Sequence, residues 1–310
     1  MAVTLSTEHI QELQEAKYLL ENLSLTAKIS GAIGSPLEKA IRVLPESTRE
    51  RIVQVTTKSL DTALYAAIHT LSKDVNAERS PRNLGHKISV ALTGAAGGAF
   101  GIAALALELP VSTTLMLRSI ADIAQSQGEN LTERDAQLAC VEVFALGGPQ
   151  AYDDAVETGY FGVRSALAKA VSDAAKHVTR FGLANSGAPV LNKFIHSVAL
   201  RFSIPVSEKV AAQAIPIIGA AGGALINTAF IQHFQSIAKG HFIVRRLERV
   251  YGPTVIREAY ASLPRQSEKP MSGESTNPAS HQSSNNNSDK SPNIRQDLTN
   301  DTNPEEKTLK

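Results

Sequence analysis

Three charged residues beside an apolar stretch are the strongest candidates for a polar site. Glu108 stands between Leu107 and Leu109 at the end of that stretch, and Arg118 and Asp122 follow at helical i, i+4 spacing. A charged group among apolar residues must be paired or reach water. The pattern therefore predicts a polar network that fixes one helix against the next. The alternative is a polar pocket in a soluble hydrolase or a metal-dependent enzyme.

Other acidic and histidine residues have spacings that also suit ordinary surface roles. Asp173 and His177 lie at i, i+4 and could ligate one metal ion, but no further ligands follow at metal spacing. A hydrogen-bonded surface pair is therefore favoured. Asp153, Asp154 and Glu157 form an acidic helix start that suits the helix dipole. We expect neither a metal site nor a cofactor.

The sequence lacks the common motifs of nucleophilic, metal-dependent and phosphate-binding enzymes. It contains no HExxH, GxSxG or GxxxxGK[ST] pattern, and no GxGxxG after a predicted strand. Cys140, the single cysteine, lies in an apolar run, which is typical of a buried structural thiol. We expect no catalytic residue in the chain.

The hexapeptide GAAGGA occurs twice, at residues 94–99 and 219–224. Each copy lies in a charge-free stretch, residues 88–107 and 210–231, and each stretch is long enough to cross a membrane core ~30 Å thick. On a helix, glycines at this spacing form a smooth face that a second backbone can approach closely. The residues predicted to form a helix crossing are Gly94, Gly97, Gly98, Gly101, Gly219, Gly222 and Gly223.

Three interpretations of the two glycine-rich stretches are open. They form a buried helix pair that crosses near Gly98 and Gly223, they span a membrane as a hairpin, or they insert into a membrane conditionally. Basic residues lie both between and outside the stretches, so neither side of a hairpin is poor in positive charge. This distribution disfavours two stable spans, and a buried pair at the centre of a bundle is the preferred prediction.

A basic amphipathic segment follows the second glycine-rich stretch. Arg245, Arg246 and Arg249 alternate there with apolar residues such as Phe242 and Leu247. Such a pattern is usually a solvated helix face. The three arginines are also a candidate contact surface for anionic lipid headgroups or an acidic partner, where each basic residue contributes about 1 kcal/mol.

Helical periodicity extends through most of the chain, and no period-2 pattern bounded by turn signals is present. Ser6 and Thr7 mark the start of a capped amphipathic helix. Further helices are predicted at Thr48–Ser72, Pro110–Ser126, Thr132–Leu146, Asp153–Arg180, Ala188–Phe202 and Ser207–Tyr260, the last with a break near Gly240. The first of these carries an apolar stripe that includes Ile52, Leu60 and Leu64, and the segment Pro205–Glu208 is predicted to start a helix. The predicted fold is all-α, a multi-helix bundle around two central Gly/Ala-rich apolar helices.

Length and composition set the domain organisation. Residues 264–310 contain no Phe or Tyr and are rich in Ser, Asn and Pro, so they are predicted to be a disordered tail. Residues 1–34 are predicted to be an amphipathic helical segment, and residues 35–263 the main helical domain. A net charge of +1 over 310 residues excludes an overall basic field for nucleic acid. The single cysteine and the absence of a secretory signal favour the cytoplasm.

Three blocks of the sequence carry a family resemblance. They are GAAGGAFGIAALALELPVSTTLMLRSIADIAQSQGENL (residues 94–131), ALGG (145–148) and IPIIGAAGGALINTAFIQHFQSIAKGHFIVRRLERVYG (215–252). Together they resemble the EcsC protein family over about residues 35–263. The resemblance implies a helical fold and, because the family takes its name from genes beside an ABC exporter, proximity to a membrane. It implies no reaction and no catalytic residue.

These observations favour a non-enzymatic intracellular helical protein of the EcsC type. We expect it to be peripheral on the inner face of the membrane or accessory to a membrane-transport system. Its predicted partners are a membrane surface or a membrane-transport protein, and no nucleic acid. Two alternatives stay open: an enzyme with a pocket around Glu108, Arg118 and Asp122, and a conditional membrane-inserting protein that uses the two glycine-rich helices.

Overall fold

The computed structural model describes residues 5–21, 24–33, 37–71, 101–148, 159–182, 188–215 and 219–264. All of these belong to one compact unit, residues 1–269. Within the described ranges the chain forms α-helices, one π-helical turn and no strand, which confirms the all-α prediction. The helices are α1 (Thr7–Glu21), α2 (Leu25–Ile33), α3 (Glu38–Arg42), α4 (Glu46–Ala66), α6 (Gly101–Ser126), α7 (Arg134–Leu146), α8 (Tyr160–Phe181), α9 (Pro189–Gln213), α10 (Gly219–Tyr251) and α11 (Pro253–Ser262), and the π-helical turn η1 is Ala67–Leu71.

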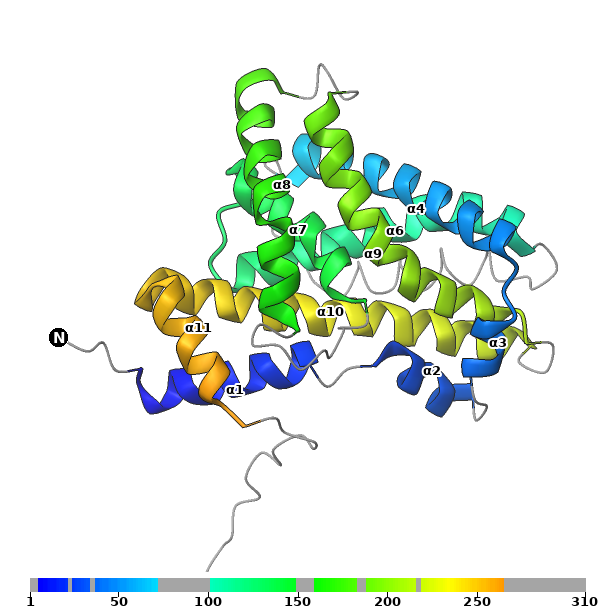
Figure 1. Cartoon of the computed structure of the whole chain (residues 1–310), viewed down its shortest axis with the longest axis horizontal. Helices are drawn as coiled ribbons and strands as arrows, with labels where there is room; N and C mark the ends of the chain where they lie inside the picture. Colours follow the sequence, from blue (N-terminus) through cyan, green and yellow to red (C-terminus); the bar gives the residue numbers. More distant parts are fainter. Residues whose placement is uncertain are drawn as a thin grey trace, which may run out of the picture. The chain divides into compact units, whose positions relative to one another are not determined.

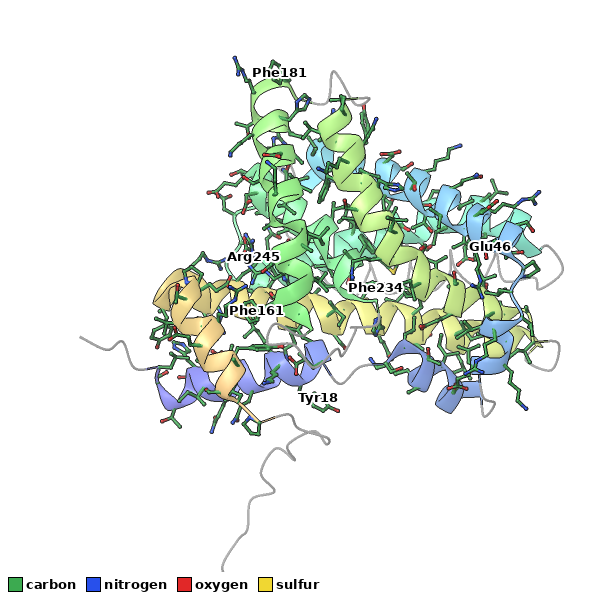
Figure 2. The ribbon with its side chains drawn as sticks, in the orientation of Figure 1. Tyr18, Glu46, Phe161, Phe181, Phe234 and Arg245 are labelled. Carbon is green, nitrogen blue, oxygen red and sulfur yellow. The ribbon has the colours of Figure 1, made fainter. Side chains whose placement is uncertain are left out.

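Helix α10 is the centre of the bundle. It packs against α1, α2, α6, α7, α9 and α11, and Figure 1 shows α1 and α2 on one side of it and α7 and α9 on the other. The Phe234 ring of α10, labelled in Figure 2, lies 5.5 Å from Phe144 of α7 and 5.3 Å from Phe202 of α9 between ring centroids. Aromatic rings bury a large apolar area. The few aromatic residues of this chain therefore support its central helix.

A second group of helices surrounds α9. Helix α4 packs against α6 and α9, and α7 packs against α8 and α9. The apolar stripe predicted on α4 is buried at Ile52, Leu60 and Leu64. These positions recur with helical spacing on one face, so burial of that face against two neighbours fixes the orientation of α4.

Helix α1 begins where its sequence predicts. The backbone N–H of His9 donates to the Ser6 hydroxyl at 3.2 Å, so Ser6 acts as the N-cap. Further along α1, the Lys17 ammonium donates to the carbonyl oxygens of Tyr260 (2.9 Å) and Leu263 (2.7 Å). Lys17 therefore ties the first helix to the C-terminal end of α11.

Gly240 does not break the last long helix, contrary to the prediction. Helix α10 runs without interruption through Gly240 to Tyr251. A Cβ atom on Gly240 would lie 2.8 Å from Leu20 Cγ and 3.0 Å from the Ala16 carbonyl oxygen of α1. Glycine is thus required here because the two helix backbones approach closely, and the packing of α1 offsets its low helix propensity.

Two prolines predicted to start helices lie inside them instead. Helix α6 begins at Gly101 and continues through Pro110, and α9 runs from Pro189 through Pro205 to Gln213. Each proline removes one helical hydrogen bond, but packing of these helices against several neighbours outweighs that loss. The actual break lies between α9 and α10, so the charge-free stretch 210–231 is divided between two helices.

Several predicted features fall wholly or partly outside the described residues. These are the first hexapeptide with Gly94, Gly97 and Gly98, the acidic residues Asp153, Asp154 and Glu157, and the tail beyond residue 264. Gly101 is the first residue of α6, and Gly219, Gly222 and Gly223 lie at the start of α10. The predicted crossing near Gly98 and Gly223 therefore stays a prediction.

Candidate functional site

Glu108 is paired, but with a residue that sequence reasoning did not single out. The Lys209 ammonium of α9 donates to the Glu108 carboxylate of α6, and it lies 5.0 Å from the ring centroid of Phe230 on α10. The Lys209 side chain is only 1% exposed. Because the two buried charges are opposite, they neutralise each other. Together with the Phe230 ring, the pair connects α6, α9 and α10.

Arg118 and Asp122 do not join Glu108. Arg118 lies ten residues further along α6, a rise of about 15 Å. Its Nε is buried without a hydrogen-bond partner in the described part of the chain, and Asp122 is exposed one turn later. The sequence does contain a signal for the true partner. Glu108 ends the first charge-free stretch and Lys209 directly precedes the second, with opposite charge.

Arg245, Arg246 and Arg249, which we call the arginine cluster, bind groups within the protein. Arg245 donates to both carboxylate oxygens of Glu129, at 2.9 and 3.2 Å, and Arg249 donates to the same carboxylate. Arg246 donates to Glu12 of α1 at 2.7 Å. Their role as a surface for lipid or an acidic partner stays a prediction, but these internal bonds already engage all three guanidinium groups.

The turn after α6 places Glu129 beside the arginine cluster. Gly128 has φ 77°, and the N–H groups of Gly128 and Glu129 donate to the carbonyls of Gln125 and Ala124, which is the Schellman arrangement. Burial alone would raise the pKa of Glu129, but the hydrogen bonds and charges of Arg245 and Arg249 outweigh it and hold the pKa below its usual value. Glu129 therefore stays ionised at neutral pH.

A cluster of buried and half-buried polar side chains lies between α7, α8 and α10. Tyr160 Oη and His241 Nδ1 are 2.9 Å apart, and Arg164 donates to both oxygens of Glu248 at 2.8 and 3.0 Å. Burial lowers the pKa of His241 well below its usual value, so the ring is neutral. Burial raises the pKa of Glu142 to about 7. Sequence reasoning missed these residues because each stands in an ordinary amphipathic helix.

Glu142 and His241 have the perturbed pKa values of catalytic groups, but neither lines any of the three cavities described below. Three cavities in the described residues measure about 640, 470 and 300 Å³, and other side chains line them. Perturbed groups indicate catalysis when they face a cleft. Here they are enclosed between helices, where hydrogen bonding and charge pairing fix helix orientation.

Gly147 and Gly148 end α7 at a point where α9 and α10 meet it. Arg201 Nε donates to the Ala145 carbonyl at 3.0 Å, and His233 Nε2 donates to the Gly147 carbonyl at 2.7 Å. A Cβ on Gly147 would overlap the Phe234 ring, and one on Gly148 would lie 3.2 Å from the Arg201 carbonyl oxygen. Only glycine fits at either position without a shift of its neighbours. The ALGG block is therefore a helix junction.

His233 is neutral at this junction. Burial lowers its pKa to about 4, although its bond to the Gly147 carbonyl acts in the opposite direction. Because a carbonyl only accepts, the proton is on Nε2, and Nδ1 is buried without a partner among the described residues.

Metal and thiol chemistry receive no support from the described residues. No group of three or more His, Cys, Asp or Glu side chains there could hold a metal ion. The predicted Asp173–His177 pair is not formed. Asp173 pairs with Lys169 at 3.1 Å, and the His177 ring lies tilted beside Phe181 with 5.1 Å between ring centroids. Cys140 is fully buried, and burial raises its pKa, which keeps the thiol protonated.

Exposed aliphatic side chains lie within or just after the two charge-free stretches. Leu107 and Val111 of α6 are 79% and 52% exposed, and Leu225 of α10 is 50% exposed. We call these three residues the apolar end. Its helices lead directly from the two glycine-rich stretches. Among the described helices, none combines the length and the apolar character needed to cross a membrane.

The matching family model covers most of the chain. The model of the EcsC protein family matches residues 7–247, which includes α1 as well as most of α10. No curated protein and no solved structure matches the sequence. Over 241 of the 310 residues, the match includes the helix junction, the Glu108–Lys209 pair and most of the arginine cluster. The chain belongs to the EcsC protein family.

Proposed function

We propose that this EcsC-family protein is non-enzymatic and associates peripherally with the inner face of a membrane, beside a membrane-transport system. The observation that carries the proposal is the exposure of Leu107, Val111 and Leu225 at the apolar end. Burying one such side chain stabilises an association by about 1.5–3 kcal/mol when burial is complete. Each side chain alone gives a weak affinity for lipid, and the three together give a stronger one.

The surroundings of the apolar end support lipid as its partner. Glu108, which follows Leu107 in the sequence, is neutralised by Lys209 inside the protein. Single exposed apolar side chains such as Val250 are ordinary. The three at the apolar end differ because they lie on helices that lead out of two charge-free stretches. An interfacial helix binds in this way, with its apolar face among the acyl chains.

The arginine cluster makes a second expectation possible. Because its guanidinium groups bind Glu129 and Glu12, little of its charge is available for anionic headgroups. Binding should then depend on apolar contact and should be nearly unchanged between 0.1 and 1 M salt, in contrast to electrostatic binding. The salt dependence of membrane binding thus shows whether the apolar end or the arginine cluster makes the contact.

Vesicle flotation tests the proposal. The double variant Leu107→Glu/Leu225→Glu should lose most of its binding to phosphatidylcholine–phosphatidylglycerol vesicles, while Val250→Glu should bind like the wild type. Val250 is the matched control because it is 61% exposed on the same helix, about 37 Å from Leu225. No binding by the wild type, or equal binding by all three proteins, would disprove the proposal. Release of trapped dye would instead indicate insertion.

A further inference from the structure

A cavity of about 470 Å³ lies between α1, α2, the end of α6 and α10. We call it the α2–α10 groove. One wall is a polar stripe on α10, at spacing i, i+3, i+4 and i+7, so all four side chains share one helix face. The stripe consists of Gln232, Gln235, Ser236 and Lys239. Gln232 and Lys239 are exposed and Gln235 and Ser236 are half-buried, so this wall of the groove is open to solvent and to ligands.

Lys28 of α2 lines the facing wall. Its side chain forms no ion pair or hydrogen bond with the described residues, and burial lowers its pKa. A half-buried ammonium without an anion is unfavourable. Burial is the largest cause of the lowered pKa of His233, and the hydrogen bond to Gly147 opposes it. The positive charge of Lys28 lowers this pKa further, as a smaller cause. The positive potential of the groove therefore reaches into the bundle.

The remaining polar groups of the groove differ in how far they are engaged. Lys239 is paired with Glu15 at 2.7 Å, and the Gln235 amide donates to Ser119 at 2.8 Å. The Gln127 side-chain oxygen accepts from Arg246 at 3.1 Å. Gln232 and Ser236 make no side-chain hydrogen bond within the described part of the chain. Their donors and the Lys28 ammonium are available to a ligand.

The lining suits an amphipathic ligand with one anionic group. No carboxylate belongs to the described lining, and Lys239 is paired with Glu15, so Lys28 supplies the net positive charge of the groove. Leu19 and Ile123 add an apolar surface beside the polar stripe. The volume is within the range of small-molecule sites. Three donors on two helices match the several oxygens of a phosphate better than the two oxygens of a carboxylate.

We propose that the α2–α10 groove binds a phosphate ester, with Lys28, Gln232 and Ser236 on the phosphate and Leu19 and Ile123 against the apolar part of the same molecule. The phosphate belongs either to a soluble ester or to a lipid headgroup. The site does not depend on the apolar end, because none of Leu107, Val111 and Leu225 lines it.

Calorimetric titration of the full chain with glycerol 3-phosphate tests the site. Lys28→Met should weaken binding tenfold or more, because it removes the charge that the phosphate would meet. Lys58→Met is the matched control, since Lys58 is an exposed lysine of α4 outside the groove, and it should bind like the wild type. Gln232→Leu should weaken binding less than Lys28→Met. Thermal unfolding followed by circular dichroism checks that each variant is folded.

Vesicles distinguish the two sources of phosphate. If the ligand is a lipid, Lys28→Met should reduce binding to phosphatidylglycerol vesicles while Lys58→Met does not, whether or not glycerol 3-phosphate binds alone. If it is a soluble ester, Lys28→Met should affect glycerol 3-phosphate only. Equal behaviour of the two lysine variants toward both probes overturns the proposal. The Leu107→Glu/Leu225→Glu variant should still bind glycerol 3-phosphate, so failure of the proposed membrane association is recognised separately.

Discussion

The two ends of α10 contact different kinds of neighbours. Toward its C-terminus, Arg245 and Arg249 meet the carboxylate of Glu129, which is only 5% exposed. Toward its N-terminus, Leu225 is half exposed, and Phe230 lies beside Lys209 of the Glu108–Lys209 pair, which is neutral as a unit. One end is therefore fixed by internal charge pairing, and the other presents apolar surface. We infer that the first contributes to stability and the second to association.

Glu129→Gln should have the largest effect on stability. It leaves two guanidinium groups without their buried anion, and we expect the free energy of unfolding to fall by about 3 kcal/mol. Urea denaturation measures the change. Asp135→Asn is the matched control, because Asp135 binds the same Arg245 at 3.1 Å but is 59% exposed, and it should cost less than about 1 kcal/mol. Equal losses would show that burial of the pair is not the source of its stability.

Gly240→Ala tests the middle of α10, where α1 packs. The new methyl group would meet Leu20 and the Ala16 carbonyl, and we expect a net loss of about 2 kcal/mol. In Gly31→Ala, on α2, the methyl group meets no atom within 4 Å, so helix propensity alone should stabilise that variant by up to about 1 kcal/mol. Chemical denaturation of both proteins separates packing from propensity. Stabilisation by both substitutions would contradict the close approach.

His233→Gln should reduce the pH dependence of stability. The pKa of His233 is about 4 in the folded protein against 6.5 ordinarily, so its contribution is complete above pH 6.5 and is lost as pH falls toward 4. The slope is at most about 1.4 kcal/mol per pH unit. Glu142, with its pKa raised to about 7, acts in the opposite direction, since its contribution is lost as pH rises from 4.5 to 7. The free energy of unfolding of the wild type and of His233→Gln is therefore measured at pH 5 and at pH 7. The same change between the two pH values in both proteins would disprove the assignment to His233.

The smallest effect on stability is expected at the two exposed apolar positions of α10. Leu225→Glu and Val250→Glu should each change the free energy of unfolding by less than about 0.5 kcal/mol, because neither removes a buried contact. Denaturation curves should nearly coincide with that of the wild type. A large loss for Leu225→Glu would mean that the apolar end is part of the core, and its role in association would fail with it.

Local patterns predicted the helices better than their ends. The Ser6 cap and the apolar stripe of α4 are confirmed because each depends on neighbouring residues. Pro110, Pro205 and Gly240 were interpreted wrongly, since tertiary packing outweighs a single unfavourable residue inside a helix. Local sequence cannot show which helix will supply that packing.

The site was harder to predict than the fold. Glu129 and Arg245 are 116 positions apart, and Glu108 and Lys209 are 101 apart. No local sequence pattern identifies the partner of any of these residues, because each contact forms only when the whole bundle folds. The groove was missed for the same reason. Its polar stripe on α10 is visible in the sequence, but Lys28 on α2 is not linked to it by any local pattern.

The contact between α1 and α10 also sets an order of events during synthesis. Leu13, Ala16 and Leu20 of α1 are buried in the folded protein, and α1 packs against α10, most closely at Gly240. Translation at 5–20 residues per second leaves about 200 residues, and roughly 10–40 s, between the emergence of α1 and that of α10. Helix α1 thus remains without its α10 partner for that time. During that interval its apolar face is open to chaperones or to a nearby bilayer.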